Sequence, residues 1–105
     1  MAKVNKIESG RLIEKIRRAI KSGEYRDTFH SAQRQSSRLI TRLEIEYVLL
    51  NGWHEKRKDA YDENYYAWNY AIRGKTIDSR NLRIIVSFDV DEMLIITAID
   101  LDKDD

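Results

Sequence analysis

Three basic side chains recur at intervals of four residues in the first half of the chain: His30, Arg34 and Arg38. If this polar segment is helical, all three lie along one face, because residues four apart are neighbours on a helix surface. A phosphate backbone would offset the repulsion between these charges, and so would a nearby carboxylate. The spacing therefore predicts either a phosphate-binding stripe with His30 as an acid or base, or a capped, ion-paired scaffold.

A second group is expected on a sheet. Tyr70 and Arg73 fall near the end of one predicted strand, and Arg83 begins the next. If the two strands are neighbours, Arg83 approaches the other two. Arginine can stabilise a pentacoordinate phosphate while tyrosine or histidine transfers a proton to or from the reacting oxygens. The candidate catalytic residues are therefore His30, Arg34, Tyr70 and Arg83.

Further residues have the chemistry of RNA contacts. Lys56, Arg57 and Lys58 are consecutive, which is typical of a phosphate-contacting loop and equally of a charged edge strand. Trp68 could stack on a base or, as one of several aromatic residues at alternate strand positions, belong to the core. The candidate RNA-binding residues are Arg38, Lys56, Arg57, Lys58, Trp68 and Arg73.

Composition narrows the possible classes of protein. The 105 residues contain no cysteine and two histidines, so no cofactor and no metal site is expected. The sequence contains no phosphate-binding P-loop, no dinucleotide-binding glycine pattern and no paired-carboxylate signal. Residues 1–42 carry 11 Lys or Arg against 4 Asp or Glu, and residues 43–105 carry 8 against 14. The resulting charges of +7 and −6 leave a basic half that can attract a polyanion, or merely two solvated faces.

Two helices are expected to support these residues. Leu12, Ile16 and Ile20 lie on one helical face, with Ser9 as the expected N-cap and Gly23 as the stop. A second helix begins at a capping box of Thr41 and Glu44, buries Ile45, Val48 and Leu49, and ends at Gly52. Between them, a weakly strand-like stretch after Glu24 leads into a short polar helix over about residues 30–38.

The second half of the chain alternates with the period of strands. Extended segments are expected over residues 53–61, 65–74, 82–88 and 93–99. The four residues 89–92 are short enough for a hairpin, so the last two strands should pair antiparallel. The expected fold is α+β, with N-terminal helices packed on one face of a small antiparallel β-sheet. One domain is expected over residues 1–105, with flexible ends at 1–8 and 100–105, in the cytoplasm and without a membrane span.

The histidine–arginine segment also resembles a bacterial family catalogued as a domain of unknown function. The shared pattern is H-[AS]-x-x-R-x-x-x-R-x-I-[ST]-x-x-E-[IV], carried here by His30, Ser31, Arg34, Arg38, Ile40, Thr41, Glu44 and Ile45. The strand segments "IRGKTIDSRNLRIIVSFD" and "MLIITAID" are similar to that family as well. The family in turn resembles RelE- and MqsR-type toxins of toxin–antitoxin modules, which implies a RelE- or barnase-like architecture.

That resemblance implies a toxin-like, metal-independent endoribonuclease that cleaves mRNA, with RNA and a cognate antitoxin as partners. The alternative is a non-catalytic domain that binds protein or nucleic acid, in which His30, Arg34 and Arg38 are structural. Neither the resemblance nor the composition indicates an oligomeric state.

Overall fold

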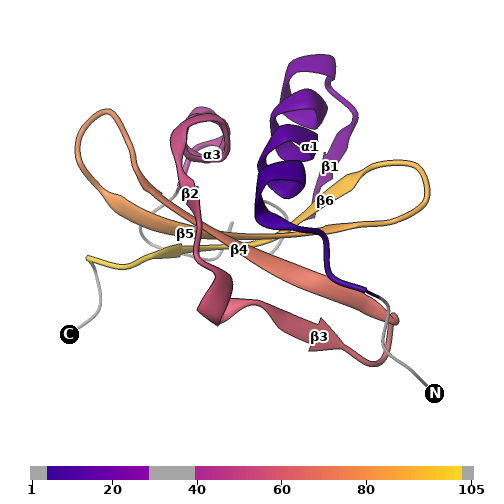
Figure 1. Ribbon diagram of the computed structural model, residues 1–105. Coiled ribbons are helices and arrows are strands. Elements are labelled where there is room, and N and C mark those ends of the chain that lie inside the picture. The colour runs from indigo at the N-terminus through magenta and orange to yellow at the C-terminus, as the bar shows by residue number, and fades with distance from the viewer. Residues whose placement is uncertain (1–4, 29–39, 103–105) are drawn as a thin grey trace.

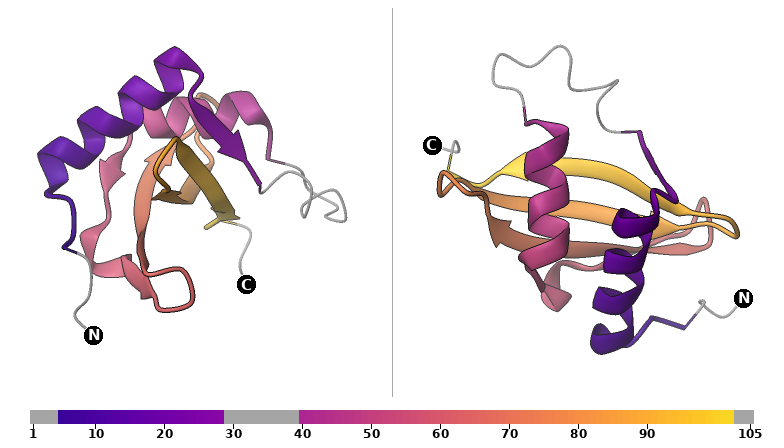
Figure 2. Two further views of the ribbon diagram at one scale, coloured as in Figure 1. Left: turned by 90° about the vertical axis from the view of Figure 1, so that its right-hand side faces the viewer. Right: turned by 90° about the horizontal axis from the view of Figure 1, so that it is seen from above.

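The computed structural model describes residues 5–28 and 40–102 and confirms both expected helices that fall within them. Helix α1 spans Ser9–Ser22 and helix α3 spans Arg42–Asn51. Leu12 and Ile16 of α1 are fully buried, as the apolar stripe predicted. Both helices lie on one side of the sheet (Figure 1). Seen from above, they lie side by side and cross the strands (Figure 2).

The helix ends follow the sequence with one difference. Thr41 and Glu44 form the expected capping box at the start of α3. Gly23 ends α1 in the left-handed conformation, with φ 80°, which glycine adopts without strain. The predicted cap at Ser9 is wrong by one residue, because the carboxylate of Glu8 accepts from the N–H groups of Gly10 and Arg11. Ser9 is the first helical residue, and its hydroxyl is used elsewhere.

Within the described residues, six strands form one mixed sheet. They are β1 (Tyr25–Asp27), β2 (Trp53–His54), β3 (Ala60–Asp62), β4 (Ala67–Lys75), β5 (Asn81–Phe88) and β6 (Met93–Asp100). The order is β1-β6-β5-β4-β2, and β3 also pairs with β4. The α+β class is confirmed, as is the antiparallel β5–β6 hairpin. The sheet is not wholly antiparallel, because β1 pairs with β6 in parallel.

The core fills the space between the helices and one face of this sheet. Successive strand residues point to opposite faces, so alternate residues of β4, β5 and β6 meet the helices. The buried apolar residues on this face include Tyr70, Ile72, Leu82, Ile84, Val86, Met93 and Ile95. The remaining alternate positions, with Arg73 and Arg83 among them, lie on the opposite face, which we call the outer face.

Gly52 lets helix α3 and strand β2 approach β4 closely. Its φ of −83° is one that any residue adopts, so the requirement for glycine is not conformational. A Cβ atom at this position would lie 2.5 Å from the backbone oxygen of Arg73 and 2.7 Å from that of Val48. The absence of a side chain therefore allows β2 to pair with β4 directly after the helix ends.

Candidate functional site

The edge of β4 is built by two short strands with a turn between them. After β2 the chain forms a single 3-10 turn, η1 (Lys56–Lys58), before it pairs again as β3. The predicted continuous extended segment over residues 53–61 is therefore interrupted. At the interruption, Glu55 donates its N–H to the backbone oxygen of Ala71 at 2.8 Å, and Asp59 accepts from the Ala71 N–H at 2.9 Å. The backbone of β4 stays satisfied, and Glu55 is held against the outer face.

Glu55 lies at the centre of a group of arginines. Its Oε1 accepts from Arg83 Nε at 2.7 Å, and its Oε2 accepts from Arg83 Nη2 at 3.1 Å. Arg73 Nη1 is 3.3 Å from Oε2, and Arg57 Nη2 is 3.6 Å from the same oxygen. Arg73 and Arg83 are direct partners across β4 and β5. The expected meeting of these two arginines is therefore confirmed, with a carboxylate between them that the sequence did not indicate.

The arginine contacts of Glu55, and not its burial, set the charge state of this group. The Glu55 side chain is 1% exposed, whereas those of Arg83, Arg73 and Arg57 are 16%, 34% and 73% exposed. Hydrogen bonds from Arg83, followed by its charge and by the contacts of Arg73, hold the pKa of Glu55 below its ordinary value even though burial opposes this. The hydrogen bond to Glu55 raises the pKa of Arg83. The carboxylate is thus an anion at neutral pH. The three arginines that cover it differ in exposure to solvent, which rises from Arg83 to Arg73 to Arg57.

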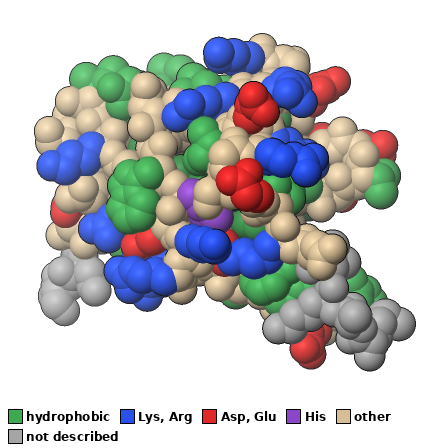
Figure 3. Space-filling model, viewed as in Figure 1, with side chains coloured by type: hydrophobic (Ala, Val, Ile, Leu, Met, Phe, Trp, Pro, Cys, Tyr) green, Lys and Arg blue, Asp and Glu red, His purple; other side chains and the backbone are tan. Residues whose placement is uncertain are grey.

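The outer face is basic around this carboxylate. Lys56, Arg57 and Lys58 of η1 are all exposed and adjoin Glu55 in the chain. With Arg73 and Arg83 they give five cationic side chains to one carboxylate, a net charge of +4 among these six residues. In Figure 3, which has the view of Figure 1, Lys and Arg side chains are spread over the face drawn, with Asp and Glu side chains among them. We call the six residues Glu55, Lys56, Arg57, Lys58, Arg73 and Arg83 the Glu55 cluster.

Tyr70 and Trp68 do not belong to this cluster. Tyr70 is 3% exposed, and its hydroxyl accepts from the Ile7 N–H at 2.9 Å. The expected approach of Tyr70 to Arg83 is wrong, because Tyr70 and Arg73 are three residues apart and period-two alternation places them on opposite faces. Trp68 is two residues before Tyr70 and therefore points to the same, helix-facing side of the sheet. Its ring packs edge-on against that of Tyr61, with 5.3 Å between the ring centroids, and lies under the Lys6 ammonium.

A second polar chain ties the start of α1 to β2. Ser9 Oγ is 2.6 Å from His54 Nδ1, and His54 Nε2 is 2.7 Å from Asp59 Oδ2, which also contacts Lys6 Nζ at 2.8 Å. The residue types are those of a hydrolytic triad. The carboxylate of Glu8, however, occupies the N-terminal amides of α1, where an oxyanion would otherwise be stabilised. We therefore interpret this chain as a structural tie between helix and sheet.

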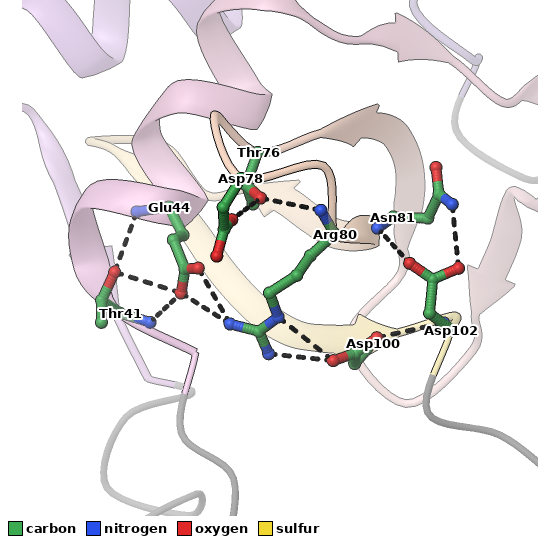
Figure 4. Close-up of polar contacts among 8 residues, drawn as sticks. All are labelled: Thr41, Glu44, Thr76, Asp78, Arg80, Asn81, Asp100 and Asp102. Carbon is green, nitrogen blue, oxygen red and sulfur yellow. Dashed lines mark hydrogen bonds and ion pairs between the residues drawn. The ribbon is translucent and has the colours of Figure 1, made fainter.

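A third group fixes the other end of the sheet (Figure 4). Arg80 donates from Nη1 to both carboxylate oxygens of Glu44 at 2.9 Å. It also donates from Nε and Nη2 to Asp100 Oδ2 at 3.2 and 2.9 Å. Burial on its own lowers the pKa of Arg80, but the hydrogen bonds that Arg80 donates to Asp100 and Glu44 outweigh it and raise the pKa. Glu44, one of the carboxylates that the sequence offers to the histidine–arginine stripe, is a partner of Arg80.

His30, Arg34 and Arg38 lie outside the described residues. Of the other predicted residues, the structure brings Arg57, Arg73 and Arg83 together on Glu55 and places Lys56 and Lys58 on either side of Arg57 in η1. It separates Tyr70 and Trp68 from them. Sequence reasoning missed Glu55 and the neighbouring Trp53. Trp53 could have been found as the aromatic residue that begins an expected extended segment, whereas Glu55, in a segment with charges on both sides, carries no such signal.

Two further properties concern the described part of the chain. No group of three or more His, Cys, Asp or Glu side chains in residues 5–28 and 40–102 is placed to hold a metal ion. Neither α1 nor α3 is long and apolar enough to cross a membrane.

Fold and site together define a small α+β domain with a basic outer sheet face built around a buried carboxylate. The model of one family, described as a domain of unknown function (DUF4258), matches residues 27–100. This match covers most of the chain, so the chain belongs to that family. No curated protein and no solved structure matches the chain.

Proposed function

We propose that the protein is a toxin-like endoribonuclease that cleaves mRNA without a metal ion, and that the Glu55 cluster is its active site. The observation that carries this proposal is the pairing of Arg73 and Arg83 around the buried carboxylate of Glu55. Two neighbouring guanidinium groups are opposite in charge to a phosphodiester, and their forked N–H donors fit its two non-bridging oxygens. The sequence resemblance to RelE- and MqsR-type toxins supports the same class of activity.

Glu55 would act as the general base. Cleavage without metal begins when the ribose 2′-oxygen attacks phosphorus and its proton passes to a base. The 5′-oxygen takes a proton from water as it leaves, and the first product ends in a 2′,3′-cyclic phosphate. Arg73 and Arg83 stabilise the additional negative charge on the phosphorane. His30, predicted as an acid or base, lies outside the described residues and retains that expected role in the proposal.

The arginine contacts of Glu55 make its basicity depend on substrate. In the free protein its lone pairs are engaged by Arg83 and Arg73, which makes it a weak base. A phosphate on the outer face competes for these guanidinium groups. As the hydrogen bonds to Glu55 are given up, its pKa rises toward the ordinary value and the carboxylate becomes able to accept the 2′ proton. The more exposed side chains of Arg73 and Arg57 are those that move aside most easily.

The test is cleavage of an unstructured RNA strand in the presence of EDTA. Glu55→Gln should lower the cleavage rate of folded protein by about 10²- to 10⁴-fold, the usual effect of losing an acid–base group. Arg73→Gln, at a partly exposed position, should lower it by about 10²- to 10³-fold. A single 2′-deoxyribose at the cleaved position should abolish cleavage there. Glu63→Gln and Arg26→Gln, at exposed positions away from the cluster, are the matched controls.

Two results would contradict the proposal. One is a wild-type protein that leaves RNA intact and does not slow growth when its expression is induced. The other is cleavage that persists at the wild-type rate in folded Glu55→Gln protein. Binding of RNA without cleavage would instead favour the second candidate, a non-catalytic nucleic-acid-binding domain. That candidate is favoured by one observation, the complete cover of guanidinium groups over Glu55.

A further inference from the structure

A row of four side chains crosses the outer face perpendicular to the strands. Trp53 of β2 is the direct partner of Arg73 of β4, Arg73 is the partner of Arg83 of β5, and Arg83 is the partner of Ile99 of β6. Direct cross-strand partners point to the same face. The row therefore reads aromatic, cation, cation, aliphatic, with Glu55 beside its two arginines.

The two ends of this row expose large apolar surfaces. Trp53 is 55% exposed and Ile99 is 39% exposed. A single exposed apolar residue needs no explanation. Here, however, Trp53 lies on the strand next to that of Arg73, and neighbouring strands are about 4.8 Å apart. The Arg73 side chain is itself partly exposed to solvent. A flat aromatic surface next to a phosphate-sized cationic position is the arrangement that holds one unpaired nucleotide.

We infer that Trp53 is the platform for a base next to the phosphate bound by Arg73 and Arg83, so that the substrate is single-stranded RNA. This inference rests on the proposed function for the position of the phosphate. Stacking on Trp53 requires a base with a free face, whereas the bases of a duplex are covered by their own neighbours. The net charge of +4 in the Glu55 cluster attracts the RNA backbone, and stacking on Trp53 selects single-stranded RNA over a duplex.

The inference is tested by binding of strands that resist cleavage. A dye-labelled 2′-O-methyl RNA is titrated with protein and followed by fluorescence anisotropy. Trp53→Ala should raise Kd by about 5- to 150-fold, the loss of one base stack, and Trp53→Phe should restore much of the affinity. The same strand in a duplex should bind more weakly to wild-type protein and should be insensitive to Trp53→Ala. Tyr65→Ala, which removes an aromatic residue that is 80% exposed in the β3–β4 turn, is the matched control and should bind as wild type.

Salt dependence separates stacking from charge. The slope of log Kd against log salt should be unchanged in Trp53→Ala and should fall by about one in Arg73→Gln. Single-strand binding should also quench the fluorescence of Trp53, measured as the difference from Trp53→Phe, since Trp68 is the one other tryptophan.

The outcomes distinguish this inference from the proposed function. Equal Kd for wild type and Trp53→Ala, or tighter binding of the duplex, would overturn the inference even if Glu55-dependent cleavage is observed. Trp53-dependent binding of single strands without any cleavage of ordinary RNA would overturn the endoribonuclease and leave the platform standing.

Discussion

Replacing Arg80 should destabilise the fold while leaving the chemistry of the outer face intact. Arg80 is three residues from Arg83 in sequence, but it joins the start of α3 to the end of β6 through Glu44 and Asp100 (Figure 4). Its side chain is 12% exposed, and those of Glu44 and Asp100 are 19% and 6% exposed. The substitution to consider is Arg80→Gln, which retains some of the packing and removes the charge.

The size of the effect follows from what is left behind. Four charge-assisted hydrogen bonds disappear, and Asp100 is left largely buried without its guanidinium. Breaking a fully buried ion pair costs about 3–5 kcal/mol. Glu44 is partly reached by water and keeps its capping-box bonds to Thr41, and Asp100 still accepts from the Asp102 N–H. We therefore expect a loss of about 2–3 kcal/mol in the free energy of unfolding, which lowers Tm by roughly 10–20 °C in a domain of this size.

Urea and thermal denaturation measure this loss, and one other arginine provides the control. Arg26 also contacts two carboxylates, Asp89 and Glu92, at 3.7 and 3.5 Å, but its side chain is 60% exposed. Arg26→Gln should change the unfolding free energy by less than about 0.5 kcal/mol. A double-mutant cycle of Arg80→Gln with Asp100→Asn should give a coupling energy of at least about 1 kcal/mol.

The reasoning would be refuted by an Arg80→Gln protein as stable as Arg26→Gln, or by a coupling energy near zero. It would also be refuted if folded Arg80→Gln protein lost binding to single-stranded RNA, because Arg80 has then been assigned to the wrong group.

Two further predictions concern the positions that hold the Glu55 cluster in place. Gly52→Ala should destabilise the protein by about 1–3 kcal/mol, because its Cβ would meet the Arg73 backbone oxygen at 2.5 Å. Gly10→Ala, whose Cβ would have its nearest contact at 3.5 Å, is the control and should be neutral or stabilising. Equal Tm values for the two variants would contradict this prediction. In acid, the lowered pKa of Glu55 means that its contribution to stability is complete above its ordinary value of 4.5 and is lost as the pH falls through the lower folded value. Unfolding free energies measured from pH 7 to pH 2 should therefore fall less steeply in Glu55→Gln than in wild type, and parallel curves would show that Glu55 is not held as an anion.

Local signals predicted the helices and the hairpin because each depends on residues close in sequence. The capping box of Thr41 and Glu44, the left-handed stop at Gly23 and the short link over residues 89–92 are all of this kind. The parallel pairing of β1 with β6 could not be predicted in this way. It joins Tyr25 to Met93 through a strand of three residues, too short to carry a periodic pattern, and depends on non-local packing.

The candidate site was predictable only in part for a similar reason. The basic residues of η1, Arg73 and Arg83 were identified from residue type, and the alternation of β4 already separated Tyr70 from Arg73. Glu55 carries no such signal. In a segment with charges on both sides it resembles one more solvated side chain. It is held against β4 because the η1 turn interrupts the edge, where Glu55 and Asp59 take the backbone hydrogen bonds of Ala71. The position depends on the irregularity of an edge, which a period-two pattern does not describe.

The two arginine groups differ in how many of their donors are engaged, and this difference is the reason for proposing the Glu55 cluster, and not the Arg80 group, as the site. Arg80 uses Nε and both terminal nitrogens on two carboxylates, so it has little capacity to bind a further anion without breaking the fold. Arg73 makes one 3.3 Å contact through Nη1 within the described residues and is 34% exposed, and Arg57 is more exposed still. In the Glu55 cluster one carboxylate is shared by three guanidinium groups, whereas two carboxylates share Arg80. In the proposed function, a phosphate would add a second anion to this excess of cations and could be held by the donors of Arg73 and Arg57 that face solvent.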